Sequence, residues 1–268
     1  MVEIANVVDA GTSIWLKGVT HSDVHAETLL ETVTQFFQEF GLPTQLTFDN
    51  DPRCVSSATG RDCPSALVRF LLCLGVEPYV CPPHRPDKNA YVERFHRTLG
   101  HECLLVHRPS TLEQVREGTE RFVFHSKHER PNQARSCGNH LPRVVRPDYP
   151  TLPRVPEYVD PERWLERLQP QAFVRKVQAD GNVTINHEPY YVKQELARQQ
   201  VMLFVNVANQ QFDIWHAEGC LKQVLIKGLH GTQLPFQEYV KVMAQEARSE
   251  YRQYRQTHPR FSQGRLWS

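Results

Sequence analysis

The stretch CPPHRPDKNAYVERFHRTLGHECL, residues 81–104, decides how the rest of the chain is interpreted. Its first part carries three prolines, and a loop of that composition does not continue into a helix. From Asn89 onward nothing breaks a helix until Arg108-Pro109. Glu93 therefore falls in the first turns of a predicted helix.

One face of this helix is an apolar stripe made of Val92, Phe95, Leu99 and Cys103. Glu93 falls at the edge of the stripe, which places a carboxylate at the rim of a core. Arg97 follows it by one turn. The same pattern also fits an ordinary first-turn glutamate that favours the helix N-terminus and pairs with Arg97.

A second stretch, QLTFDNDPR at residues 45–53, carries further acids. Leu46 to Phe48 is typical of a short buried strand, and Asp49-Asn50-Asp51-Pro52 of a turn at its exit. An acid at the end of a strand is well placed over a crevice. The alternative is that these side chains only form the turn by capping their own backbone.

Taken together, FDND after a strand and NAYVERFHRTLGHECL on a helix resemble the second and third acids of the retroviral-integrase-like (DDE) transposases. IANVVDAGTSIWLKGVT, residues 4–20, is similar to that family's second and third strands. FHSKHERPNQARSCGNHLP, residues 124–142, is similar to the segment after its acid helix. The resemblance covers roughly the first 150 residues, in the manner of bacterial insertion-sequence transposases, and implies an α/β ribonuclease-H-like core.

The chain departs from the family at its start. In the family the first catalytic acid lies on a central strand upstream of the hairpin, whereas this sequence opens with the hairpin itself. Asp9 is the nearest acid, and its VVDAGTS context predicts turn formation rather than catalysis. Either the true start codon lies upstream, or the chain is a remnant of an inactivated element.

The resemblance implies a metal site made by Asp49 and Glu93. Cleaving or joining a phosphodiester develops negative charge on the entering and leaving oxygens, and two Mg²⁺ or Mn²⁺ ions bound by carboxylates would stabilise it. Each of the two acids would anchor one ion, while the bridging acid lies outside this sequence. Asp51 is a disfavoured substitute ligand. The candidate DNA contacts are Lys88, Asn89, Arg97 and Arg130.

Composition narrows the class of protein. With 268 residues, 40% of them hydrophobic, the chain can form two cores. It has neither a long apolar run nor a basic and apolar leader, so we expect no membrane span and no export. The seven cysteines form no CxxC pair, which favours reduced thiols over zinc binding. We expect a cytoplasmic bacterial protein associated with the nucleoid.

The net charge of +1 does not by itself indicate nucleic acid, but its distribution is uneven. Two segments, 127–154 and 241–268, each hold six basic residues against two acids. Such clusters suit phosphate contacts, although a solvated surface explains each of them equally well. The first cluster consists of Lys127, Arg130, Arg135, Arg143, Arg146 and Arg154.

The predicted elements up to the acid helix follow an α/β order. They are a hairpin at 2–19, a helix at 22–40 with Ser22 as its N-cap, the strand at 46–48, a helix at 63–74 and a strand at 76–80. We predict four regions: a catalytic core at 1–150, a linker and short helix at 151–170, a small β-barrel at 171–228 and a basic helical tail at 229–268.

The barrel prediction rests on about five strands between Phe173 and Ile226, with Asp180-Gly181 as a hairpin turn. It is similar in architecture to the SH3-like barrel that follows many integrase cores and binds DNA or assembles the complex. A final helix at 237–255 is compatible with a place along DNA, along a partner subunit, or as a frayed surface helix.

Two classes of function stay open. The first is a DDE transposase that joins element ends to target DNA, which requires DNA as partner and at least a dimer. The second is a truncated or domesticated copy that binds DNA or oligomerises without cutting. A ribonuclease-H-type nuclease is disfavoured, because the HERPNQ segment and the barrel both resemble transposase parts.

Overall fold

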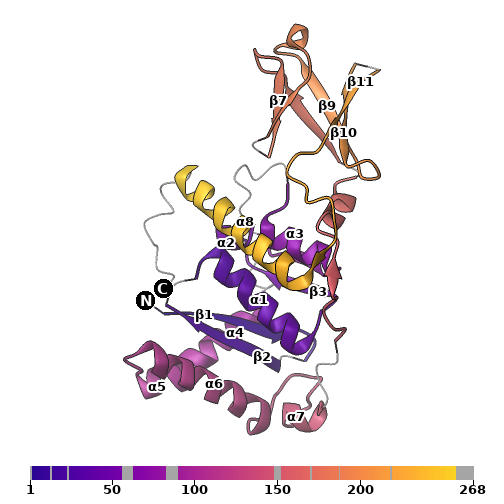
Figure 1. The fold of residues 1–268 in the computed structure, drawn as a ribbon. Helices are drawn as coiled ribbons and strands as arrows, with labels where there is room; N and C mark the ends of the chain where they lie inside the picture. Colours follow the sequence, from indigo (N-terminus) through magenta and orange to yellow (C-terminus); the bar gives the residue numbers. More distant parts are fainter. Residues whose placement is uncertain are drawn as a thin grey trace.

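The computed structural model describes residues 2–12, 14–22, 24–55, 63–82, 90–147, 152–169, 171–186, 188–217 and 219–257 (Figure 1). Its first half alternates strands and helices, as the sequence predicts. The elements that precede the acid helix are β1 Glu3–Asp9, β2 Ile14–His21, α1 Ala26–Phe40, β3 Gln45–Phe48, α2 Pro52–Val55, α3 Ala66–Cys73 and β4 Glu77–Val80. After it come α4 Ala90–Leu99, the π-helical segment Gly100–Leu104, α5 Leu105–His107, α6 Leu112–His128 and α7 Pro142–Val145.

Strands β1 and β2 form the predicted antiparallel hairpin. One carboxylate oxygen of Asp9 accepts hydrogen bonds from the backbone N–H and the hydroxyl of Thr12, at 2.6 and 2.5 Å. A short side chain that bonds its own backbone in this way fixes a turn. Asp9 therefore has the turn-forming role that the sequence predicts for it.

Strands β3 and β4 pair in parallel, with Leu46 opposite Pro78 and Phe48 opposite Val80. The two pairs of strands are separate sheets, and no ladder joins β1 to β3 within the described residues. The described first half is thus a mixed α/β arrangement with two short sheets rather than one.

Helix α1 begins at Ala26, four residues later than predicted, and Ser22 is not its cap. The reason lies in the backbone just before it, where the N–H of Val24 donates to a carboxylate oxygen of Glu3 at 2.8 Å. This bond ties the segment to the start of β1 and delays the helix. Helix α3 also begins late, because Ser65 accepts a bond from the N–H of Val68 and acts as the N-cap.

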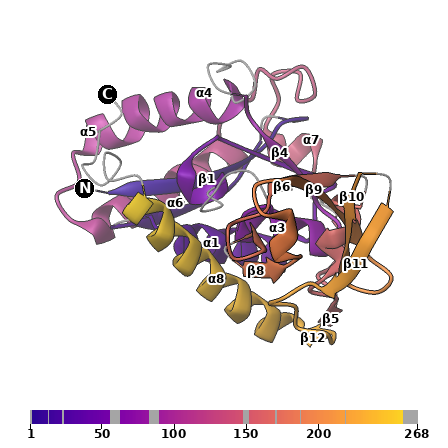
Figure 2. The ribbon, with the colours of Figure 1, turned by 90° about the horizontal axis from the view of Figure 1, so that it is seen from above.

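The main core lies between α1, α3 and the C-terminal helix α8, Phe236–Thr257. The rings of Phe37, Phe70 and Tyr239 stack in sequence, with centroid distances of 6.2 and 5.7 Å. Figure 2 shows α8 running along α1 and past α3. The sequence left three places open for this helix: along DNA, along a partner subunit, or as a frayed surface helix. In the structure α8 is packed on the chain's own core.

A second, smaller core covers the other face of the hairpin (Figure 1). Trp15 of β2 packs there against Phe95 of α4 and Phe122 of α6, with ring centroids 3.6 and 5.9 Å away. Leu99 and Cys103 complete it, as the predicted apolar stripe requires. The acid helix is therefore held against β2 by its apolar face.

The second half begins with β5 Tyr158–Val159 and the 3₁₀ segment Arg163–Arg167, followed by β6 Ala172–Lys176, β7 Asn182–Ile185, β8 Glu188–Tyr191, a 3₁₀ turn Gln194–Leu196, β9 Gln200–Asn206, β10 Gln211–His216, β11 Gly219–Leu225 and β12 Leu234–Pro235. Four of these strands form an open sheet in the order β11-β10-β9-β6, while β7 and β8 pair only with each other. Among the described residues the strands do not close the predicted barrel. The turn at Asp180-Gly181 links β6 to β7, but β6 pairs with β9 instead.

Candidate functional site

Asp49 directly follows β3 and is exposed. The short helix α2 begins after Asp51, at Pro52. Glu93 lies in the first turn of α4 and is also exposed. Because Phe95 packs on Trp15, the apolar stripe of α4 is turned inward and Glu93 points away from the core. The second acid is thus an exposed carboxylate beside the stripe.

His96 connects these two acids. It follows Glu93 by three residues, a spacing that puts both side chains on one face of the helix. Partial burial lowers the pKa of His96, and the negative charges of Asp49 and Glu93 both act to raise it. Both carboxylates therefore lie close enough to the imidazole for their charges to act on it.

The ordinary pairing of Glu93 with Arg97 does not form. Both residues are described, and neither makes an ion pair with the other. The spacing of one helical turn made that pair the simplest alternative to a functional role for Glu93.

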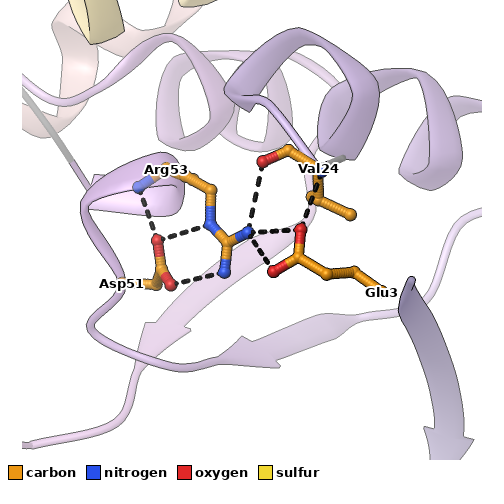
Figure 3. A network of polar contacts seen from close by, with 4 residues as sticks. All are labelled: Glu3, Val24, Asp51 and Arg53. Atoms are coloured by element: carbon orange, nitrogen blue, oxygen red, sulfur yellow. Dashed lines mark hydrogen bonds and ion pairs between the residues drawn. The ribbon is translucent and has the colours of Figure 1, made fainter. Parts of the chain in front are cut away.

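Asp51 is engaged elsewhere. Arg53 donates to one of its carboxylate oxygens from the backbone N–H and from Nε, and to the other oxygen from a terminal nitrogen at 2.8 Å (Figure 3). The same guanidinium reaches Glu3 at 3.0 Å and the carbonyl oxygen of Val24 at 3.2 Å. The two carboxylates hold the pKa of Arg53 well above its ordinary value. Asp51 is therefore an anchor between α2 and β1, which agrees with disfavouring it as a metal ligand.

Of the four predicted DNA contacts, the structure describes two. Lys88 and Asn89 lie outside the described residues. Arg97 is exposed on α4, on the same helix as Glu93. Arg130 forms an ion pair with Glu102 of the π-helical segment, so part of its charge is offset within the chain.

The donor chemistry of the two acids suits a hard divalent cation. Mg²⁺ is commonly bound by one or two protein carboxylates and keeps several of its waters. Asp49 and Glu93 supply such a set, whereas no group of three His, Cys, Asp or Glu side chains arranged for a metal is found in the part of the chain that the structure describes.

The sequence predicts Asp49 and Glu93 as candidate acids, and the structure adds His96 as the residue on which both of their charges act. The signal that could have found it is its spacing of three residues from Glu93. The Glu3–Arg53 contact was beyond reach, because fifty positions separate the two residues along the chain.

Comparison with known proteins gives a match over part of the chain. Residues 74–140, which include Glu93, match the family described as Integrase core domain.

Two solved structures are similar to this chain. One is the catalytic core domain of BIV integrase, at 17% identity and a TM-score of 0.38, covering 54% of this chain and 91% of that one. The other is a simian T-cell lymphotropic virus intasome in complex with PP2A regulatory subunit B56 gamma, at 12% identity and a TM-score of 0.40, covering 84% of this chain and 75% of that one. Within the described residues no helix combines the length and the apolarity needed to cross a membrane.

Proposed function

We propose that this chain acts in integrase- or transposase-type DNA strand transfer, with Asp49 and Glu93 as the carboxylates that hold divalent cations. The observation that carries the proposal is the match of residues 74–140, which include Glu93, to the family described as Integrase core domain. The two acids come from separate elements, the exit of β3 and the first turn of α4. Two carboxylates from these separate elements would hold the cation between β3 and α4.

The chemistry assigned to the site is displacement at a phosphodiester. A bound Mg²⁺ or Mn²⁺ would supply charge stabilisation for the attacking and leaving oxygens. Asp49 and Glu93 would hold the cation through hard oxygen donors. Arg97, on the helix of Glu93, would contribute a positive charge beside the DNA backbone.

The direct test is Mg²⁺-dependent joining of a labelled DNA end to a target duplex, with Asp49→Asn and Glu93→Gln as variants. We expect both substitutions to abolish joining while leaving the fold unchanged by circular dichroism. Glu166→Gln is the matched control, because it removes one exposed carboxylate in the 3₁₀ segment of the second half. Full activity in either site variant would refute the assignment.

The second candidate function is DNA binding or oligomerisation without cutting. It is favoured by the exposed position of Arg97 on α4, where the side chain can contact a phosphate whether or not the acids hold a cation. Under this alternative the chain retards a DNA duplex in a gel but gives no joined product at any Mg²⁺ or Mn²⁺ concentration. The two functions are separated by running both assays on the same preparation.

The proposed partners follow from the reaction. Joining needs the element ends and a target DNA, and two ends held together require at least two copies of the chain. The open sheet of β6, β9, β10 and β11 is proposed to take the DNA-binding or assembly role that was expected of a barrel. We also propose that the protein works in the bacterial cytoplasm, at the nucleoid.

A further inference from the structure

The open sheet of β6, β9, β10 and β11 has an apolar outer face. Figure 1 shows β9, β10 and β11 set apart from the helices α1, α3 and α8. The inner face of the sheet is packed, since Leu203 and Ile214 are completely buried. On the outer face, by contrast, Val174 is 51% exposed, and Met202 and Trp215 are each 36% exposed. Neighbouring apolar side chains left exposed on one face mark an interaction surface.

The register of the strands places three of these side chains in one row. Val174 of β6 pairs with Met202 of β9, and Met202 pairs with Trp215 of β10. Residues directly opposite each other on neighbouring strands share a face of the sheet. The ring of Phe204 meets the ring of Trp215 edge to face, with their centroids 6.2 Å apart. The Trp215 ring is therefore held in place before a partner arrives, which lowers the entropy cost of binding.

The outer face carries one cation and one anion. Lys176 lies on β6 and Asp213 on β10, and the other outward positions of β6, β9 and β10 are uncharged. The side-chain amides of Asn206 and Gln211 donate to the carboxylate of Asp213 at 3.3 and 3.2 Å. Within the described residues neither Lys176 nor Asp213 forms an ion pair. A face without net charge suits a protein partner, whereas a DNA backbone is met by an excess of lysine and arginine.

The positions of the two charges make the face complementary to itself. Lys176 of β6 pairs with Gln200 of β9. Asp213 of β10 pairs with Phe204 of β9. Met202 stands between Gln200 and Phe204 on this central strand, and so lies midway between the two charges. A two-fold axis at Met202, in the plane of the interface, would place Lys176 of each copy opposite Asp213 of the other.

We propose that the outer face of this sheet binds the same face of a second copy of the chain, with Met202 at the two-fold axis and a Lys176–Asp213 pair on each side. Tryptophan and methionine are enriched at the centres of protein interfaces, and charged pairs around them fix the orientation of the partners. The inference deepens the proposed function and rests on it for its purpose, because joining two DNA ends requires two copies. The contact itself needs neither DNA nor a metal ion.

The first test is sedimentation velocity of the whole chain without DNA, over a series of protein concentrations. We expect a reversible dimer in the wild type and a dimer dissociation constant raised about tenfold in Met202→Gln, because a side chain at the centre of an interface carries much of its binding energy. The matched control is Leu105→Gln, which removes a leucine of α5 that is 63% exposed. This control should leave the dissociation constant unchanged.

The second test exchanges the two charges. Lys176→Glu and Asp213→Lys each place like charges opposite one another twice in a two-fold dimer, so we expect each to raise the dissociation constant about tenfold or more. The two substitutions combined should restore the dimer. The control is Lys241→Glu, which reverses an exposed charge on α8 and should have no effect. Circular dichroism of every variant establishes that it is folded.

The outcomes separate this inference from the proposed function. A monomeric wild type, a dimer that none of the substitutions weakens, or single charge reversals that the combination does not rescue would each overturn the inference. Loss of DNA binding in Met202→Gln with an unchanged dimer would make nucleic acid the occupant of the face and overturn the second copy. An intact dimer that joins no DNA overturns the proposed function alone.

Discussion

Arg69 of α3 and Glu250 of α8 form an ion pair inside the molecule, with only 13% and 19% of their side chains exposed. Arg69 also pairs with Glu246 at 2.7 Å and lies 5.6 Å from the ring centre of Trp164. Glu250 accepts a further bond from the N–H of Ala66 at 2.8 Å. The C-terminal helix is therefore attached to the core by buried charge as well as by apolar packing.

Replacing Arg69 by methionine should destabilise the chain strongly. The substitution leaves Glu250 and Glu246 without their cation in a poorly hydrated place, and breaking one partner of a buried pair costs about 3–5 kcal/mol. Urea unfolding followed by circular dichroism would measure this loss. The control is Arg248→Met, since the Arg248–Glu27 pair also joins α8 to the core but its arginine side chain is 57% exposed. A loss in Arg69→Met no larger than in Arg248→Met would contradict the buried-pair account.

A second prediction concerns the close approach of β2 to its neighbours at Gly18. A Cβ at this position would lie 2.6 Å from a ring carbon of Trp15 and 3.1 Å from a methyl carbon of Thr119. Forcing a methyl group into a packed site costs about 1–3 kcal/mol. We expect Gly18→Ala to lose stability in this range and to shift the fluorescence of Trp15.

Gly219→Ala is the matched control for Gly18. Gly219 also lies in a strand, but an added Cβ there would meet nothing within 4 Å. Alanine should therefore be tolerated at Gly219 without loss. Equal stability of the two variants would mean that the hairpin and α6 do not pack as closely as the structure has them.

The sequence predicted local elements well and long-range pairings poorly, for physical reasons. The apolar stripe on α4 repeats with the period of a helix, and the acid turn after β3 is marked by turn-forming residues. Both can therefore be recognised within a short window of sequence. The pairing of β6 with β9 joins residues 24 to 32 positions apart, from Lys176 with Gln200 to Ala172 with Phe204, and nothing in the Asp180-Gly181 turn indicates it. The site shows the same division, because the two acids follow from their local context, whereas the role of Arg53 depends on Glu3, on another element.

Thiol chemistry gives a third prediction. Cys220 is exposed, whereas burial raises the pKa of Cys63 to about 11 and raises the pKa of Cys73 and Cys103. Since the thiolate is the reactive form, Cys220 should be alkylated first at pH 8 and the others only slowly. Mass spectrometry of peptides after timed iodoacetamide treatment would give the order. Rapid labelling of Cys73 in the native protein would show that α3 is not packed as described.

The last prediction is a pH dependence of stability that comes from His21. Its pKa is lowered first by burial and also by Arg116, while Glu31 and Glu3 oppose this, and the ring bonds the hydroxyl of Thr32 at 3.1 Å. A histidine whose pKa is lower in the folded state takes up its proton more readily when unfolded. Its contribution to stability is therefore full above pH 6.5 and is lost as the pH falls from 6.5 through the folded pKa.

We expect urea midpoints of the wild type to fall across that window, and His21→Gln to remove part of the fall. His107→Gln, which replaces an exposed histidine of α5, is the control and should keep the wild-type profile. The difference between the two variants isolates the proton taken up at His21, because acids elsewhere titrate equally in both. Parallel profiles for all three proteins would mean that His21 has the same proton affinity folded and unfolded, and that the face of the hairpin against α1 is hydrated.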